Sequence, residues 1–311
     1  MLMGLTLPEV ALLLAGGVVL DLLLGEARRW HPLVGFGNLA MRIEGALNAG
    51  GLRKLRGILG WSLAVLPLSA LAVWVCDFAG MVPHALLLYC CIGFRSLREH
   101  NLPISDALVR GDILQARELT GRIVSRDTAQ ASEADLAKAS AESLLENGND
   151  AVFATLFWFV VAGGAGAVLF RLANTLDAMW GYRSTRFLQF GWAAARIDDV
   201  LNVIPARLTA LSYVLLADDR RLAWRCWRSQ APNWPSPNAG PVMASGAGAL
   251  GLALGGSASY DGVPEQRPPL GQGRAAVAGD IVRAWKLVQA TTVLWVALFG
   301  AAAIAVSVLH A

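Results

Sequence analysis

Side chains that could do chemistry gather in four segments of an otherwise apolar sequence. They lie at residues 21–38, at 126–128 with 142–150, at 171–184 with 190–207, and at 236–240 with 259–271. Guanidinium groups bind phosphate and carboxylate oxygens, whereas carboxylates bind Mg²⁺ or accept protons. Groups of mixed charge with Asn, Gly and Trp are typical of a polar site at a membrane surface.

Spacing suggests how the carboxylates could be used. Glu142 and Glu146 are four residues apart, so a helix would carry them on one face. Asp198 and Asp199 are adjacent and cannot share one face of a helix. We therefore expect these two aspartates at a helix end or in a loop, where two carboxylates can hold a hydrated Mg²⁺.

A third group combines a base, an amide and an acid. Arg171, Asn174 and Asp177 follow one another at intervals of three residues, which places them on the same side of a helix. Outside these groups, the sequence has no GxxxxGK[ST] phosphate loop, no GxGxxG after a strand, no HExxH and no GxSxG. No standard nucleotide, zinc or hydrolase motif therefore identifies the reaction.

The elements that must position these residues are helices in a membrane. The chain is 55% hydrophobic and 16% charged, whereas soluble domains are about a quarter charged. Its 11 Trp residues suit a bilayer interface, and its net charge of +3 gives no indication of nucleic-acid binding. We predict an all-α, polytopic integral membrane protein with about four to six membrane-embedded segments, together with cytoplasmic amphipathic helices and loops.

Hydropathy and charge predict the spans and their orientation. The best candidates for full spans are residues 7–25, 58–76, 80–94 and 291–310, of which the third is the shortest. The first has no basic segment before it, so we expect it to be a retained span and not a signal peptide. Loop 26–56 carries six Lys or Arg against two Glu, while 77–83 carries neither Lys nor Arg. The positive-inside rule then places loop 26–56 in the cytoplasm.

For two apolar runs, the sequence leaves open whether they cross the membrane. Residues 151–170 are apolar enough to span, but "AGGAGA" at 162–167 breaks the run near its middle. Residues 200–217 contain Asn202 and Pro205 in their first half. Each run either crosses the membrane or enters and returns, and a returning run needs protein or a cavity around it.

The more polar segments are predicted to lie on the membrane surface. Residues 95–150 favour short amphipathic helices, one of them starting after Ser132 and closing at Gly148. Within 218–290, "MASGAGALGLALGGSA" (243–258) is expected to pack as a helix and "SYDGVPEQRPPLGQG" (259–273) to form a turn-rich loop. We treat 1–311 as one membrane-embedded domain in which 95–150 and 218–290 are the larger cytoplasmic segments.

The quoted groups together resemble a known family. The matching stretches are "DLLLG…WHPLVGFGN", "IVSRDT", "ESLLENGNDAVFATLFW", "RLANTLDAMWGYR", "FGWAAARIDDVLNVIPARLTA", "SPNAG" and "Y-DG…RPPLG". In this order, and over nearly the whole chain, they resemble the CobD/CbiB family of cobalamin biosynthesis. That likeness is far more specific than any single motif in the sequence.

The resemblance implies an activity and a place. It implies a multi-pass enzyme of the bacterial inner membrane, an adenosylcobinamide-phosphate synthase whose active site faces the cytoplasm. Such an enzyme joins adenosylcobyric acid to (R)-1-aminopropan-2-ol, or to its O-phosphate, through an amide bond. ATP with Mg²⁺ is expected to drive the step through an acyl phosphate. Because ATP is cytoplasmic, we prefer re-entrant or interfacial paths for 151–170 and 200–217.

The resemblance also gives roles to the residues of the groups. We expect catalytic carboxylates at Glu142, Glu146, Asp150 and Asp177. We expect the metal ligands Asp198 and Asp199. We expect substrate or ATP contacts from Arg126, Asp127, Asn147, Asn149, Arg171, Asn174, Trp180, Tyr182, Arg183, Arg196, Asn238 and Tyr260. Trp180, Tyr182, Trp192 and Tyr260 would cover the apolar face of the corrin ring.

Other functions and partners stay open at this stage. A non-catalytic AmpE-like membrane sensor or scaffold would not need four mixed polar groups, and a small-molecule transporter would favour internal pseudo-symmetry, which the sequence lacks. Membrane lipid is an expected partner and nucleic acid is not. A homo-oligomer and contacts with other late corrinoid-assembly enzymes are open alternatives. The sequence does not decide whether the amine is phosphorylated or which carboxylate binds Mg²⁺.

Overall fold

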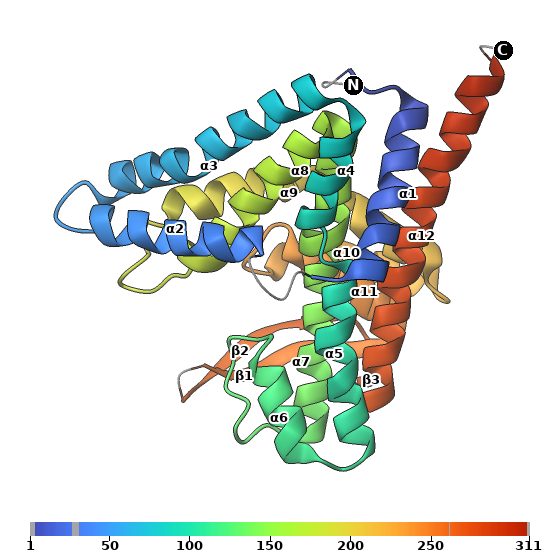
Figure 1. Cartoon of the computed structure of the whole chain (residues 1–311). Helices are drawn as coiled ribbons and strands as arrows, with labels where there is room; N and C mark the ends of the chain where they lie inside the picture. Colours follow the sequence, from blue (N-terminus) through green and yellow to red (C-terminus); the bar gives the residue numbers. More distant parts are fainter. Residues whose placement is uncertain (1–3, 27–30, 261, 310–311) are drawn as a thin grey trace. The chain divides into compact units, whose positions relative to one another are not determined.

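The computed structural model describes residues 4–26, 31–260 and 262–309, and most of them are helical (Figure 1). The elements are α1 (Leu7–Leu24), α2 (Pro32–Leu47), α3 (Arg53–Ala79), α4 (Met81–Cys91), α5 (Phe94–Val109), α6 (Ile113–Gly121), α7 (Glu133–Gly148), the π-helix η1 (Asn149–Phe153), α8 (Ala154–Trp180), α9 (Trp192–Leu216), α10 (Arg220–Gln230), the 3₁₀-helix η2 (Ala231–Asn233), α11 (Ala239–Leu250), β1 (Leu252–Tyr260), β2 (Val263–Leu270), β3 (Arg274–Ala275) and α12 (Ala278–Leu309). The predicted polytopic, mostly helical architecture is confirmed, with a small sheet added to it.

Five helical stretches of the described chain are long and apolar enough to cross a membrane. They are Leu7–Leu24, Arg53–Ala79, Glu133–Trp180, Trp192–Leu216 and Ala278–Leu309. The span predicted at 80–94 is wrong, because α4 ends at Cys91 after 11 residues. A crossing helix needs about 20 residues. Gly80, at φ 69°, separates α4 from α3.

The chain divides into two compact units. The first unit comprises Met1–Gly93, Asp150–Asn202 and Val296–Ala311, and the second comprises Phe94–Asn149 and Val203–Trp295. The polar segments 95–150 and 218–290 fall in the second unit except for Asp150, which begins a segment of the first. All of α1, α3 and α8 thus belongs to the first unit, whereas α9 and α12 each contribute residues to both units.

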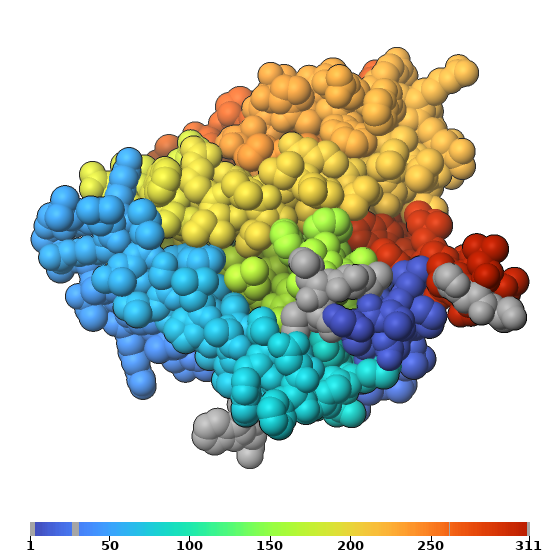
Figure 2. Space-filling model, turned by 90° about the horizontal axis from the view of Figure 1, so that it is seen from above, coloured from blue at the N-terminus to red at the C-terminus, as the bar shows by residue number. Residues whose placement is uncertain are grey.

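Helices α1 to α4 and α8 form the first unit, together with the start of α9 and the end of α12. Helix α1 packs on α4, while α3 and α4 pack on α8 and α2 packs on α3 (Figure 1). The core includes Phe36, Trp61, Trp180 and Phe190, all less than 9% exposed. Figure 2 shows α1 in dark blue beside the dark-red end of α12. These helices bury aromatic side chains against one another and leave many Leu side chains exposed, as expected of helices that face lipid.

Gly57 is the point of closest approach between α3 and the segment before α9. A Cβ at this position would lie 2.0 Å from the carbonyl oxygen of Phe190. Gly57→Ala is therefore expected to destabilise the protein by about 1–3 kcal/mol, because the backbone at Phe190 would have to move. Thermal unfolding in detergent measures this loss. Gly45→Ala is the control, since a Cβ at Gly45 meets nothing within 4 Å. Equal melting temperatures for the two variants would contradict the close packing.

The apolar run 151–170 is broken where the sequence predicts a break. Ala162 (φ −139°, ψ 29°) and Gly163 (φ 58°, ψ −152°) leave helical geometry inside α8. A side chain at Gly163 would meet the His84 ring at 2.4 Å, and the freed N–H of Gly164 donates to His84 Nδ1 at 3.0 Å. Glycine is needed here both for the positive φ and for the close approach of His84. Whether this run spans or re-enters stays a prediction.

Helices α5, α6 and α7 pack together in the second unit. Helix α7 begins as predicted, because Ser132 and Asp135 form a reciprocal capping box. The α-helix ends at Gly148, the residue predicted to close it, but the chain does not leave helical structure there. The chain continues through η1 into α8, so the helical stretch runs from Glu133 to Trp180. The π-helix η1 shifts the register of side chains just where Asn149 and Asp150 lie.

A three-stranded sheet replaces the loop predicted in the second unit. The strand order is β2-β1-β3; β2 is antiparallel to β1 and β3 is parallel to it. Helix α11 stops at Leu250 because Gly251 takes a left-handed conformation (φ 65°). The predicted helix 243–258 is therefore wrong beyond Leu250, and the predicted loop 259–273 contains β2. The three prolines of β2 are tolerated because it is an edge strand.

Candidate functional site

Four aspartates of the first unit come within electrostatic range of one another. Asp177 of α8 interacts with Asp150 of η1 and with Asp199 of α9, and Asp198 interacts with Asp150 and Asp177. A Cβ at Gly181 would lie 2.0 Å from Asp177 Oδ1, so the glycine leaves room for that carboxylate. Like charges gathered inside a protein are costly, and this makes the group a candidate for binding a cation or moving a proton.

The two adjacent aspartates of α9 point in different directions. Asp198 is 8% exposed and accepts hydrogen bonds from Asn174 Nδ2 at 3.3 Å and Asn202 Nδ2 at 3.0 Å. Asp199 pairs with Arg196 at 3.2 Å on a more exposed face. The prediction that they lie at a helix end or in a loop is wrong, since α9 begins earlier, at Trp192. Asp198 is therefore the buried one of the two, and Asp199 is the more exposed member of the acidic group, paired with arginine.

Arg171 is a half-buried base whose charge interacts with this acidic group. Its Nη1 donates to Asn174 Oδ1 at 3.3 Å, as their spacing predicts, and its charge interacts with Asp150. Its Nε is buried and finds no hydrogen-bond partner in the described part of the chain. Leaving such a donor unsatisfied costs about 1–3 kcal/mol, which an oxygen of a bound ligand would recover. The first unit thus offers both anionic groups and an unused guanidinium N–H.

The carboxylates of this acidic group fit a Mg²⁺ ion shared with substrate phosphates better than an ion bound by protein ligands alone. Among the described residues, no three His, Cys, Asp or Glu side chains converge into a metal site. Mg²⁺ usually takes one or two carboxylates and completes its shell with water and substrate phosphates. Asp150, Asp177, Asp198 and Asp199 could supply that number, and Arg171 could hold the phosphate. The residues present therefore fit a metal–phosphate complex.

Glu142 forms the centre of a different group in the second unit. Its Oε2 accepts from Arg126 Nη2 at 2.6 Å and from Arg267 Nη1 at 2.9 Å. Its Oε1 accepts from Arg267 Nη2 at 3.2 Å and from the Gly255 N–H at 2.7 Å. The side chain is 2% exposed. With both oxygens engaged, Glu142 joins α7 to the hairpin β1–β2, which favours a positioning role over contact with substrate.

The two guanidinium groups that bind Glu142 differ in how fully their N–H groups are hydrogen-bonded. Burial would lower the pKa of Arg267, but the Glu142 carboxylate outweighs that effect and raises this pKa. Arg126 Nη1 is buried without a hydrogen-bond partner. Arg126 also lines a pocket of about 980 Å³ within the second unit, together with Asp127, Thr128 and Lys138. This pocket is a candidate site for a polar small-molecule ligand.

The loop that forms this pocket is attached to the hairpin. The Asp127 N–H donates to the Ser259 carbonyl at 2.8 Å, and Asp127 Oδ2 accepts from the Gly262 N–H at 2.7 Å. Lys138 Nζ donates to the Ser257 carbonyl at 3.2 Å across the same space. Asp127 therefore holds the pocket wall in place through its backbone and its side chain.

The other predicted polar residues of the second unit are mostly engaged. Asn149 Oδ1 accepts from Thr209 Oγ1 at 2.9 Å, and Asn238 Oδ1 accepts from Arg207 Nη1 at 2.5 Å. Asn147 Nδ2 bonds the Ser143 carbonyl at 3.0 Å. Glu146 and Tyr260 are half-buried, and both interact electrostatically with Arg267. These contacts place Glu146 and Tyr260 near the Glu142 group.

The aromatic residues of the first unit that were predicted to cover a corrin ring differ in their exposure. Trp180 is 1% exposed and packs against Phe190 with ring centroids 5.0 Å apart, so it belongs to the core. Tyr182 is 54% exposed, Trp192 is 43% exposed and Arg183 is exposed. Burial removes Trp180 from the surface that a large ligand could reach, whereas Tyr182 and Trp192 keep an accessible face.

Three partners in these groups were not identified from the sequence. Arg267 lies between prolines in a segment predicted as a loop, so no periodicity pointed to it. Asn202 bonds Asp198 from one turn further along α9, a spacing that could have indicated the pair. Arg186 binds Glu44 at 2.5 Å across 142 positions of sequence. The Arg186 guanidinium holds the pKa of Glu44 below its usual value.

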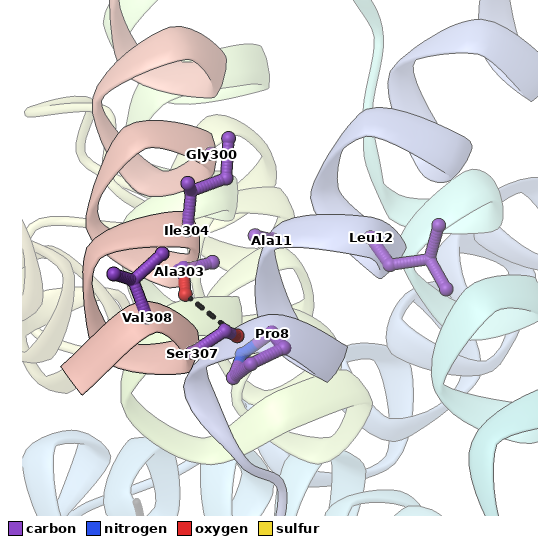
Figure 3. A pocket seen from close by; sticks show the side chains of 8 residues that line it. All are labelled: Pro8, Ala11, Leu12, Gly300, Ala303, Ile304, Ser307 and Val308. Carbon is purple, nitrogen blue, oxygen red and sulfur yellow. Dashed lines mark hydrogen bonds between the residues drawn. The ribbon is translucent and has the colours of Figure 1, made fainter. Parts of the chain in front are cut away.

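The groove between α1 and α12 has no charged side chain in its lining. It measures about 510 Å³ and is lined by Pro8, Ala11, Leu12, Gly300, Ala303, Ile304, Ser307 and Val308 (Figure 3). Its one polar side chain, Ser307, donates to the Ala303 carbonyl at 3.0 Å within its own helix. Apolar lining without a charged group indicates a lipid-facing groove and not a catalytic centre.

Comparison with known proteins gives one consistent result. Residues 14–288 match the family model described as CobD/Cbib protein. Similar proteins include the "Cobalamin biosynthesis protein CobD" of Stutzerimonas stutzeri, 56% identical over 94% of this chain and 98% of that protein. The protein of the same name from Chromobacterium violaceum is 53% identical over 97% and 99%. That of Mycobacterium tuberculosis is 39% identical over 86% and 88%. No solved structure gives a significant match.

Proposed function

This chain belongs to the CobD/Cbib protein family of cobalamin biosynthesis, and from that premise we propose that it is an adenosylcobinamide-phosphate synthase. The proposed reaction joins adenosylcobyric acid to (R)-1-aminopropan-2-ol O-phosphate, or to aminopropanol itself, through an amide bond. ATP supplies the free energy. The enzyme would be an acid–amine ligase of the bacterial inner membrane with its active site towards the cytoplasm.

The observation that carries the proposal is the acidic group of the first unit beside the unsatisfied Nε of Arg171. A carboxylate is a poor acyl donor. It becomes reactive when one of its oxygens takes the terminal phosphoryl group of ATP, with release of ADP. The amine then attacks the carbonyl carbon of the acyl phosphate, and inorganic phosphate leaves. Positioning and charge neutralisation dominate such phosphoryl transfers.

Residues of the first unit suit both steps. Arg171 Nε can donate to a phosphate or carboxylate oxygen, because it has no hydrogen-bond partner among the residues that the structure describes. The amine arrives as an ammonium ion, which the acidic group attracts. It must lose protons before or during the attack, and Asp177 or Asp198 can accept one. Mg²⁺ bound at these carboxylates would neutralise the negative charge of the phosphates.

Contacts inside the first unit support the view that the α8–α9 connection and loop 26–56 lie on the same side of that unit. Arg186, in the connection between α8 and α9, binds Glu44, and its carbonyl accepts from Asn48 Nδ2 at 3.1 Å. The end of α8 therefore opens on the same side as the end of α2, which belongs to the basic loop 26–56. The positive-inside rule assigns that loop to the cytoplasm, where ATP is available.

A labelling experiment tests this orientation. Ser184→Cys and Ala49→Cys, both at exposed positions, are introduced separately into a variant without the four native cysteines. Both new thiols are expected to resist a membrane-impermeant maleimide in spheroplasts, whose outer membrane has been removed, and to react in inverted vesicles. Ready labelling of the thiol at position 184 from the periplasmic side would contradict the cytoplasmic site.

Product formation tests the reaction itself. The purified protein in detergent is supplied with adenosylcobyric acid, ATP, Mg²⁺ and either aminopropanol or its O-phosphate. The expected result is the amide, identified by mass spectrometry, together with one ADP per amide. Omitting ATP or chelating Mg²⁺ is expected to abolish the product. Absence of an amide with both amines, from a protein that remains folded, would overturn the proposed function.

A further inference from the structure

Helix α10 carries a concentrated positive charge that the proposed reaction does not use. Its 11 residues, "RRLAWRCWRSQ", include four arginines and no acid. Arg220, Arg221, Arg225 and Arg228 are all exposed. Within the described chain none of these four guanidinium groups takes part in an ion pair. By contrast, the half-buried Arg95 and the exposed Arg122 are each paired with a glutamate one turn away.

The two faces of α10 are clearly separated. Ala223 and Cys226 are buried against α11, where a Cβ at Gly248 would lie 2.8 Å from Ala223 Cα. Gln230 fixes the end of the helix by bonding the N–H and the carbonyl of Gly271 at 2.6 and 2.9 Å. On the opposite face, arginines 221, 225 and 228 follow one another at spacings of four and three residues and form a continuous row.

Two tryptophans border this row of arginines. Trp224 is 46% exposed, and its ring packs edge-on against Trp227 with centroids 5.1 Å apart. Indole rings with one accessible face are favoured at the level of lipid headgroups, where an apolar body and an N–H are both accommodated. A row of arginines beside a tryptophan pair is the arrangement expected of a helix lying in the interface.

The chain places α10 close to the end of a candidate membrane span. Helix α9 ends at Leu216 and α10 begins at Arg220, with Asp219 capping it by accepting from the Leu222 N–H at 2.9 Å. Three residues extend at most about 11 Å. If α9 reaches the membrane surface at its end, the arginines of α10 lie within reach of the headgroups.

We propose that the exposed face of α10 binds the headgroups of anionic phospholipids. An acidic protein or a nucleic acid would also attract arginines, but the exposed Trp224, the half-buried Trp227 and the short link to a candidate span favour the lipid surface. The proposal does not depend on the reaction proposed above. Each basic residue near an anionic surface contributes about fivefold to affinity, so the row of three contributes about a hundredfold.

Lipid binding can be measured on the whole chain in detergent. Phosphatidylglycerol or phosphatidylcholine is titrated into the protein, and the lipids retained are counted by native mass spectrometry. We expect preferential retention of phosphatidylglycerol at low salt, weakened in 1 M salt because exposed charges are screened. The variant with Arg221, Arg225 and Arg228 all changed to Gln is expected to lose about a hundredfold in affinity for phosphatidylglycerol.

A matched variant removes the same charge elsewhere. Arg98, Arg110 and Arg122 are exposed residues of the second unit on or beside α5 and α6, and changing all three to Gln is expected to leave lipid retention unchanged. Melting temperatures without added lipid verify folding. If the α10 triple variant does not fold, Arg225→Gln alone is expected to lower the affinity about fivefold.

Three results would overturn the proposal. The first is equal retention of the two lipids by the unchanged protein. The second is an equal loss of phosphatidylglycerol in the two triple variants. The third is α10-dependent binding of poly-glutamate or an oligonucleotide at physiological salt without lipid preference, which would assign the face to a soluble anionic polymer instead.

Discussion

Asp177→Asn is expected to lower the rate of amide formation at least about 100-fold, the size of effect typical of a lost proton-transfer group. Asp177 is the member of the acidic group that interacts with both Asp150 and Asp199. The substitution keeps the shape of the side chain but removes its charge and its basicity. Activity is measured as amide formed per protein at saturating substrates.

Stability gives this prediction its second readout. Removing one of several neighbouring negative charges relieves repulsion, so the melting temperature of Asp177→Asn is expected to stay constant or to rise. Asp77→Asn is the control, since Asp77 is exposed on α3 of the same unit. It should leave both rate and melting temperature unchanged. A loss of folding parallel to the loss of activity would mark Asp177 as structural, and full activity would remove it from the site.

Glu142→Gln is expected to destabilise the second unit by about 3–5 kcal/mol, because two buried guanidinium groups would lose their shared counter-charge. Arg126 and Arg267 are 13% and 9% exposed in their side chains, so water can replace the carboxylate only poorly. A loss of this size corresponds to a fall in melting temperature of roughly 10 °C for a body of this length. Thermal unfolding in detergent measures it.

Glu118→Gln provides the matched comparison. Glu118 pairs with Arg122 at 2.6 Å, but both side chains are more than 60% exposed, so the change should cost at most about 0.5 kcal/mol. If Glu142→Gln instead melts like the unchanged protein and loses only activity, Glu142 is catalytic, as its position in the sequence suggested. The two outcomes separate a positioning role from contact with substrate.

Local signals in the sequence were sufficient for much of the helical architecture. The capping box at Ser132 and Asp135 starts α7 through contacts three residues apart. The break in α8 follows from Gly163, which alone tolerates the positive φ beside His84. The shared face of Arg171 and Asn174 follows from helical geometry once that segment is known to be a helix. In each case a few neighbouring residues determine the result.

Tertiary structure decided what no local pattern contains. The prolines and glycines around Arg267 predict turns, although the segment forms strand β2. This strand forms because β1 pairs with it. Glu142 meets Arg267 across 125 positions of sequence, so its role depends on packing between α7 and that hairpin. Asp198 turned inward while Asp199 did not, because α9 continues through both and only one side of a helix faces its neighbour.

By itself the sequence determined that the protein is a mostly helical membrane protein and pointed to most polar residues of its candidate groups, though not to Arg267. Both follow from hydrophobic length and from spacing along the chain, which are properties of neighbouring residues. Only the fold decided which carboxylates are neutralised by arginine and which are left among other carboxylates. That distinction depends on burial and on partners far apart in the sequence, since the free energy of a charge depends on what surrounds it.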